Sequence, residues 1–508
     1  MANTVGAFIR RGTAGPLTAG PDAGDMVFVV LQANRGPVNV PTLVTSPGRF
    51  TAAFGGPTTF SDGKRYSTGH ELVQLLFTKG VRKITVLRVV GDSATLGGVE
   101  LMDGETVPAA CLLVNGKGEG SWVEDYEVHI SEGTRADTFK LSIYTAGGEA
   151  AGDEPIEVHD NLTMAGDDLA RVSDASDLVT LDGLSANIPA NGTFLLNATT
   201  PGVDDNEPEA AEIVGTDVDG VKTGLKCLRR RSLGRGFVMA PDLDHDDLVR
   251  DELRLQTEAF FRVYMASGPA GLTPAAAITD AHKVRAFNVA YHYPRLQVVD
   301  AYTKERKTVP ASAHVVADWL RVIGTKGPAK APAGRDFRLD FVRGLEARSN
   351  GEALVDEGVA ELLVANGVNP LWDRDGTGPK VWGARSTSDD PAWIYLHDAY
   401  LWCLISSNMQ AMLDRETYES DNNGLLFSRI NGGMRLFMLD LHNQGAFYGK
   451  APLEGEDPSE EHAFATRCDA DMLTAQDKNT GILRAEIWFK SALTAETILC
   501  TVAKRVNE

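Results

Sequence analysis

The apolar residues near the start of the chain alternate between strand-like and helix-like spacing. A run of apolar residues at 25–31 predicts a buried strand, and the β-branched segment 82–90 predicts another. Between them, residues 68–79 carry leucines at helical spacing, and Gly80 stands where this helix would end. A strand, a helix and a strand in this order predict an α/β layer over residues 25–98.

The same alternation returns over residues 223–400. The predicted elements are a strand at 236–240, helices at 246–265, 313–322 and 351–363, a helix opened by Thr273-Pro274, and a hairpin with arms at 371–372 and 380–382. Both stretches are therefore expected to belong to one discontinuous α/β body.

The intervening residues, 99–222, have the pattern of an inserted, mainly-β domain. Turn glycines separate its strand candidates, which lie at 111–115, 126–130, 139–144 and 193–197. Charge also sets this block apart, because residues 99–220 contain 26 acidic and 4 basic side chains while the whole chain has a net charge of −21. A block that repels itself is expected to face solvent, although an acidic surface also simply favours solubility.

The C-terminal residues, 401–508, begin in helices and end in strands. Helices are predicted at 395–415 and 425–444, with a kink or break at Gly432-Gly433. From Gly481 the spacing becomes strand-like, and a second β-rich run lies at 497–502. Since no later element ties a terminal strand back, such a strand is free to pair with a neighbouring chain.

The N-terminal residues, 1–24, are rich in glycine and read as an extended linker arm with one short β segment. We expect a hinge at Gly12, Gly15 and Pro16. The residues predicted to exchange between subunits are Val5, Ala7, Phe8, Ile9, Leu483, Ala485, Ile487, Phe489, Ile498, Cys500 and Val502. The predicted fold class is thus mixed α/β and α+β, with an inserted acidic domain and terminal strands exchanged between subunits.

The composition indicates the cellular compartment in which the chain folds. No apolar run approaches the roughly 20 residues that span a bilayer, and the N-terminus lacks the pattern of a signal peptide. We therefore expect folding in a cytoplasm, with no membrane partner. Five scattered cysteines favour reduced thiols over a disulfide framework, and the acidic block disfavours direct contact with nucleic acid.

Candidate chemistry is weak. Gly91-Asp-Ser93 resembles the nucleophile turn of some hydrolases, but no matching Asp and His follow later in the chain. The glycine-rich segment 115–120 lacks the spacing of a Walker motif and predicts a hairpin turn instead. His442, His462 and Cys468 lack metal-ligand spacing, and the acidic run 204–207 is better read as a solvated loop than as a calcium site. We expect no enzyme activity, no cofactor and no metal.

Short motifs in collinear order carry a resemblance to a known family. They are Val27-Phe-Val-Val30, Arg35-Gly-Pro-Val-Asn-Val-Pro41, Phe54-Gly-Gly56, Lys83-Ile-Thr-Val-Leu-Arg-Val-Val90, Tyr291-His-Tyr-Pro294, Asn366-Gly-Val-Asn-Pro370, Val381-Trp-Gly-Ala-Arg385 and the ending from Gly481. In this order they resemble the tail sheath proteins of contractile phage tails and related injection systems, over about two thirds of the chain. Gly120-Ser-Trp122 resembles the start of the insertion in many sheath proteins, but Val123-Glu-Asp125 departs from the family's Gly-Asn pair.

The resemblance implies a structural subunit that polymerises into stacked six-subunit rings around a tail tube and contracts to drive that tube through a cell envelope. It implies partners in further copies of the chain, the tube protein, the baseplate and the tail terminator, and a location in a virion tail or another contractile particle assembled in the host cytoplasm. Residues 401–508 would then be inner and residues 99–222 outer. The alternatives are an α/β hydrolase with an accessory β domain and another lattice-forming structural protein.

Overall fold

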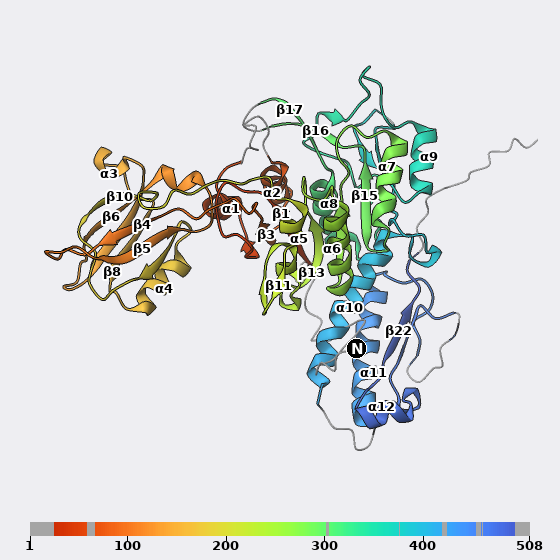
Figure 1. Ribbon diagram of the computed structural model, residues 1–508. Helices are drawn as coiled ribbons and strands as arrows, with labels where there is room; N and C mark the ends of the chain where they lie inside the picture. The colour runs from red at the N-terminus through yellow and green to blue at the C-terminus, as the bar shows by residue number, and fades with distance from the viewer. Residues whose placement is uncertain are drawn as a thin grey trace, which may run out of the picture.

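The computed structural model describes residues 25–57, 67–300, 304–374, 376–418, 424–453, 459 and 461–492. Figure 1 shows three parts: a central α/β body, a lobe of strands to one side, and a C-terminal unit of long helices and short strands below. We use "lobe" for residues 98–196 and "C-terminal unit" for residues 396–492. The body comprises the remaining described residues.

An eight-stranded sheet forms the centre of the body. Its order is β2-β3-β1-β13-β14-β15-β19-β20, with parallel pairing throughout except at the two edges, β2 and β20. The strands are β1 (Asp25–Leu31), β2 (Thr42–Val44), β3 (Ile84–Arg88), β13 (Arg235–Met239), β14 (Arg262–Ala266), β15 (Val289–Tyr293), β19 (Asn369–Trp372) and β20 (Lys380–Val381). Most of the inner parallel strands are buried along their whole length, as a sheet covered on both faces requires.

Helices cover both faces of this sheet. One apolar core lies under α1 (Pro47–Phe54), α2 (Thr68–Thr78), α8 (Ser312–Lys326) and the start of α10 (Leu396–Glu416). The other lies under α5 (Ala210–Val214), α6 (Asp247–Ala259), α7 (Pro274–Ala281) and α9 (Glu357–Ala365). A small antiparallel sheet, β17-β16-β18, follows β15; its strands are β16 (Leu296–Val299), β17 (Arg306–Val309) and β18 (Gly344–Leu345).

The lobe has two sheets that enclose a core of their own, from Val99 to Leu196. One sheet has the order β4-β5-β9 and the other β10-β6-β7-β8. The elements are β4 (Gly98–Met102), β5 (Ala110–Gly116), β6 (Tyr126–Glu132), β7 (Phe139–Thr145), α3 (Gly148–Ala151), β8 (Glu157–Leu162), α4 (Gly166–Ala175), β9 (Val179–Gly183) and β10 (Gly192–Leu195). A hairpin of β11 (Asp217–Val218) and β12 (Val221–Lys222) follows on the return to the body.

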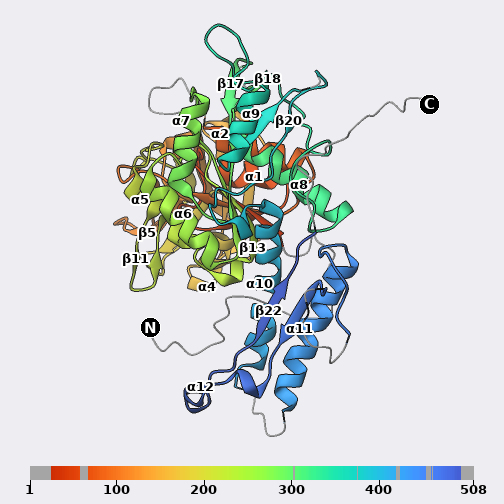
Figure 2. The same ribbon diagram turned by 90° about the vertical axis from the view of Figure 1, so that its right-hand side faces the viewer.

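The C-terminal unit pairs α10 with α11 (Leu425–Asn443), and a two-stranded sheet packs against them. That sheet consists of β21 (Phe464–Arg467) and β22 (Glu486–Phe489), with the short helix α12 (Ala475–Thr480) between them in sequence. The first turns of α10 lie in the core of the body, whereas Ile405, Met409 and Met412 lie in the core of the C-terminal unit. One continuous helix therefore joins the two parts, as both views show (Figures 1 and 2).

Four predicted elements differ from the structure. The helix predicted at 246–265 ends at Ala259, because Phe261 takes a left-handed backbone (φ 58°) and β14 begins at Arg262. The helix predicted at 351–363 begins only at Glu357, where the side chain of Asp356 caps it.

The other two concern the C-terminal unit and the lobe. Gly432-Gly433 does not break α11, since Ile430 and Met434 are buried on either side and their packing offsets the cost of about 1 kcal/mol per glycine. The segment 115–120 is no hairpin turn, because β5 and β6 belong to different sheets. It lies against the body instead, where a Cβ on Gly118 would come within 2.0 Å of the carbonyl oxygen of Gly36.

Candidate assembly interface

The start of β1 is anchored by buried polar contacts. Asp25 opens β1, and its carboxylate lies 2.9 Å from the guanidinium of Arg235 on the neighbouring strand β13. The hydroxyl of Tyr400 on α10 donates to the same carboxylate at 2.5 Å. The start of β1 is thereby fixed at the junction of the body and the C-terminal unit.

Charge and burial make this anchor specific. Asp25, Arg235 and Tyr400 are all buried. Burial and the adjacent carboxylate hold the pKa of Tyr400 well above its usual value, and the Asp25 carboxylate raises the pKa of Arg235 despite the opposing effect of burial. Removing Asp25 would leave the buried guanidinium of Arg235 without its counter-charge.

The sheet of the C-terminal unit presents one apolar face to the helices. The predicted alternation holds, since Leu483, Ala485, Ile487 and Phe489 pack against the α10–α11 core while Arg484, Glu486 and Lys490 are exposed. The hydrogen-bonded strand is shorter than expected and begins at Glu486.

The same sheet has two strands in the described part of the chain, which pair antiparallel from Phe464↔Phe489 to Arg467↔Glu486. Beyond Phe489 the chain continues between two segments: Lys490 donates to Ala463, and Tyr448 donates to Lys490. A two-stranded sheet has two outer edges, and further strands can extend it through main-chain hydrogen bonds.

An ion pair fixes the approach to β22. Arg484 contacts the carboxylate of Asp477 through two nitrogen atoms, both at 2.8 Å. Asp477 also caps α12 together with Thr474, and these hydrogen bonds hold the pKa of Asp477 well below its usual value. Because Arg484 is turned toward α12, the ladder starts two residues later.

The C-terminal unit exposes several large apolar side chains. Leu425 and Leu436 stand on the outer side of α11, opposite its buried stripe, and are 71% and 62% exposed. Tyr448 and Trp488 are exposed near the sheet. The apolar pattern of the chain did not predict the exposure of these four side chains. For Leu425 and Leu436 the available signal was an apolar residue off the main helical stripe.

The other predicted exchange and hinge residues fall in the arm or at the chain end. Val5, Ala7, Phe8, Ile9, Gly12, Gly15, Pro16, Ile498, Cys500 and Val502 lie outside the described residues. Their roles stay predictions.

The crevice where α/β sheets of this kind bind ligands is filled by the protein itself. β1 leads to β3 on one side and β13 leads to β14 on the other, so the switch point lies at the carboxyl ends of β1 and β13. Asp242, with a left-handed φ of 67°, places its carboxylate there and accepts from the Thr68 amide (2.7 Å) and hydroxyl (2.5 Å) at the start of α2. This carboxylate occupies the position at which a helix start would otherwise receive an anionic ligand.

The weak chemical motifs serve as structural contacts. The backbone amide of Ser93 donates to Asp205, and Asp204 accepts from the amide and hydroxyl of Ser121. The acidic run is thus not a merely solvated loop, because it ties the returning chain to the entrance of the lobe. Among the described residues, no group of three or more acidic, histidine or cysteine side chains is arranged to hold a metal ion.

Two further observations concern cysteines and membranes. Cys111, Cys227, Cys403 and Cys468 are buried and are not joined in disulfides. None of the helices in the described ranges is both long and apolar enough to cross a bilayer.

Comparison with solved structures identifies the fold. No protein-family model and no curated protein matches the sequence. A sheath tail protein from Listeria innocua superposes with a TM-score of 0.56 at 12% identity, covering 95% of this chain and 96% of that chain. A chain of the anti-feeding prophage baseplate in its contracted state gives 0.55 at 15% identity, covering 96% and 95%.

A chain of the contracted helical sheath of the anti-feeding prophage gives a TM-score of 0.52 at 16% identity, covering 97% of this chain and 99% of that chain. The similarity thus extends over nearly the whole length of both chains. The chain has the fold of tail sheath proteins, as its motifs predict.

Proposed function

We propose that this chain is the structural subunit of a contractile sheath. It polymerises as a helical sleeve around a tube and shortens from an extended state to drive the tube through a target envelope. The observation that carries the proposal is the near-complete coverage of sheath structures, one of them a contracted helical sheath. The filled crevice at Asp242 speaks against the hydrolase alternative.

Linkage between copies is proposed to use shared strands. The arm of one copy, through Val5 to Ile9, and the chain end of another, through Ile498 to Val502, would extend the β21–β22 sheet of a third. The two edges of that sheet and the rigid base of the arm at Asp25 support this arrangement. Because such links run head to tail, they generate an open helix rather than a closed dimer.

We propose that each part of the chain takes its own position in the sleeve. We infer an arm at 1–24, a body at 25–98 and 223–400, an outer insertion at 99–222 and an inner, tube-facing part at 401–508. The lobe and the C-terminal unit project from different sides of the body, and the separate lobe core supports an insertion (Figures 1 and 2). The exposed leucines of α11 are candidates for the tube contact.

The partners proposed beyond the sleeve are the tube protein, the baseplate and a tail terminator. Assembly in the host cytoplasm and a final location in a contractile particle follow from the same proposal.

Electron microscopy of the purified chain tests the function. We expect long striated hollow cylinders, alone or on co-expressed tube. Isolated particles with hydrolytic turnover would support the hydrolase instead, and flat sheets or closed shells another lattice protein.

Deleting residues 1–11 tests the strand links. The body fold should persist by circular dichroism, because β1 begins only at Asp25, whereas cylinders should no longer form. Cylinders of normal length from this variant would contradict the role of the arm.

The lobe provides a matched control. Gly98 and Thr200 are bridged by two backbone hydrogen bonds of 2.9 Å, so a two-glycine linker can replace residues 99–199. We expect that variant to polymerise. A folded but monomeric product would show that the lobe takes part in assembly.

A further inference from the structure

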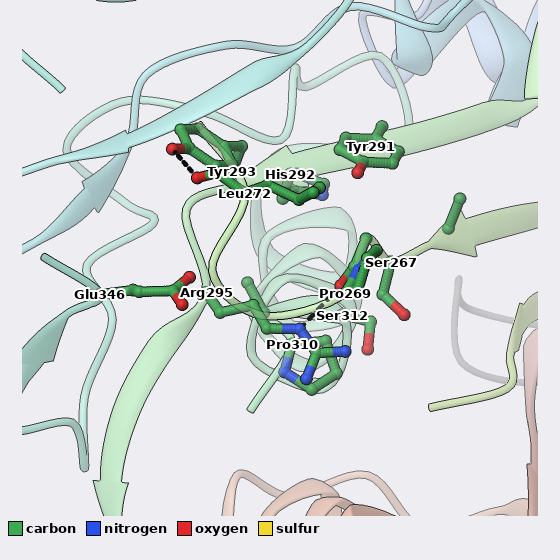
Figure 3. Close-up of a pocket in the computed structure, with 13 residues that line it drawn as sticks. Ser267, Pro269, Leu272, Tyr291, His292, Tyr293, Arg295, Pro310, Ser312 and Glu346 are labelled. Atoms are coloured by element: carbon green, nitrogen blue, oxygen red, sulfur yellow. Dashed lines mark hydrogen bonds between the residues drawn. The ribbon is translucent and has the colours of Figure 1, made fainter. Parts of the chain in front are cut away.

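A small cavity opens where β14 and β15 end in the body. It is lined by the loop after β14, by the end of β15 and the residues after it, and by the start of α8 (Figure 3). Its volume is about 10 Å³, enough for one small ligand. The crevice filled by Asp242 lies at other strands, β1 and β13, so the two places are distinct.

Three polar atoms on the wall of this cavity have no hydrogen-bond partner. They are Nε2 of His292, Nη2 of Arg295 and Oγ of Ser312. His292 and Ser312 are 9% and 4% exposed, so water outside the protein does not satisfy them. An unpaired buried polar atom costs about 1–3 kcal/mol, and three beside one cavity indicate a missing shared partner.

The start of α8 adds donors to the same cavity. Ser312 is the first residue of this 15-residue helix, and no side chain caps it. The first helix amide that donates to a backbone carbonyl is that of Val315, which bonds to Ala311 at 3.0 Å. Amides in the first turn of a helix favour negative charge.

Arg295 supplies a positive charge without a matching carboxylate in the described residues. Its Nε donates to the carbonyl oxygen of Gly268 at 2.8 Å, and the guanidinium ends beside Ser312 and Pro310 (Figure 3). The carboxylate of Glu346 lies on the far side of the pocket, where it accepts from the Gly271 amide at 2.6 Å.

The nearby acids are already engaged. Asp244 accepts from Tyr264 and from the amide and hydroxyl of Ser267, and Asp280 is paired with Arg250 at 2.6 Å. Neither carboxylate neutralises Arg295. The cavity is therefore rich in donors and carries an uncompensated positive charge.

We propose that this cavity is a binding site for one small anion of about chloride size, held by Arg295, Ser312, His292 and the start of α8. The anion would join three segments that are distant in sequence: the loop at Ser267, the end of β15 and the start of α8. A neutral water also fits the space, but it leaves the charge of Arg295 without a counter-ion among the described residues.

Bromide provides a direct probe because its anomalous scattering marks its position. Crystals of the full chain grown with sodium bromide should show an anomalous peak between Arg295 and Ser312. A water molecule at this position, with no anomalous signal, would overturn the proposal.

Thermal unfolding in solution provides a second probe. Replacing sodium gluconate by sodium chloride at constant ionic strength should raise the transition by about 2–4 °C and reach a plateau. In Arg295→Met this chloride-dependent rise should vanish, and in Ser312→Ala it should shrink. Arg343→Met, which removes an exposed arginine outside the cavity, is the matched control and should keep the full rise.

Two outcomes of the unfolding experiment contradict the site. One is a chloride response that is equal in Arg295→Met and the parent chain. The other is a response that grows linearly with chloride and never saturates, as a general salt effect would.

Discussion

The body and the lobe handle charge in opposite ways. The body buries ion pairs: Lys79, directly after α2, contacts Asp318 on α8 at 2.6 Å, and both side chains are less than 8% exposed. In the lobe, carboxylates sit at loops and accept hydrogen bonds from nearby backbone and hydroxyl groups, as Asp160 does from Thr134 and Asp168 does from Thr163. The buried pair in the body joins segments 239 positions apart, whereas Asp160 and Asp168 are satisfied by groups within the lobe itself.

The titratable groups of the body and of the lobe also differ in the direction in which the fold favours their charge. Burial lowers the pKa of His70 and His292 to about 4 and that of His314 to about 3, so all three are neutral inside the body. Local hydrogen bonds hold the pKa of Asp103, Asp160 and Asp168 in the lobe below the usual value. The body therefore needs its histidines uncharged, and the lobe needs its carboxylates charged.

This difference suits two roles in one subunit. Ion pairs in the body join segments that are far apart in sequence, so we expect the loss of one pair to destabilise the body as a whole. The same pairs would allow the body to transmit force between its ends. A lobe with a separate core and self-contained loops depends little on the rest of the chain.

Breaking the anchor at the base of the arm should have the largest effect. In Asp25→Asn the buried Arg235 loses its counter-charge, which we expect to destabilise the body by roughly 3–5 kcal/mol. Hydrogen exchange followed peptide by peptide should show faster opening in the body sheet and unchanged protection in the lobe. Asp251→Asn, at an exposed pair with Arg254, is the control, and equal loss of protection in the lobe would contradict the contrast.

The second largest effect is expected from acid, which should unfold the body at a higher pH than the lobe. Since unfolding frees histidines of pKa about 6.5, each buried histidine removes up to about 1.4 kcal/mol per pH unit as pH falls from 6.5 to about 4. The lobe carboxylates, whose pKa values are lowered, stabilise the fold above about pH 4 and lose that contribution only below it. The body is thus expected to unfold first.

Exchange rates measured at stepped pH check this order. His314→Met removes one proton-binding group and should make the pH dependence of the body shallower between pH 6.5 and 4. Simultaneous unfolding of body and lobe would contradict separate causes.

The sequence predicts best where the signals are local. The apolar run at 25–31 coincides with β1, Thr273-Pro274 opens α7, and the hairpin arms at 371–372 and 380–382 pair as Leu371↔Val381. In each case neighbouring residues alone set the backbone, through burial, capping or turn chemistry.

The rest depends on contacts between distant residues, which periodicity does not reveal. The hydrogen bond from Tyr400 to Asp25 joins residues 375 positions apart. The left-handed backbone of Asp242 is set by its hydrogen bonds to Thr68, and the start of β22 is delayed by the pairing of Arg484 with Asp477. The sequence predicted the apolar face from Leu483 to Phe489. It did not predict how many residues of β22 pair with β21.

The contact between lobe and body gives a smaller test. Gly118 has a φ of 115°, and a Cβ there would meet the carbonyl oxygen of Gly36 at 2.0 Å. We expect Gly118→Ala to cost about 1–3 kcal/mol and to loosen the lobe without unfolding it. Limited proteolysis should cut the connections to the lobe faster. Gly104→Ala, where a Cβ meets nothing within 4 Å, should leave the rate unchanged.

The smallest effect is expected at an exposed ion pair between the same two parts. Three arginines among the described residues of the body contact the lobe. Arg35 donates to the hydroxyl of Tyr126, and Arg88 is buried and donates to Gly36 and Glu119. Arg49 on α1 is 71% exposed and lies 3.5 Å from Asp177. Because solvent screens the exposed pair, Arg49→Met should change stability by less than about 1 kcal/mol and leave proteolysis of the connections unaltered. If Arg49→Met instead loosened the lobe as much as Gly118→Ala, and 0.5 M salt did the same to the parent chain, attraction between the acidic lobe and the body would hold them together. The buried contacts around Arg88 would then be secondary.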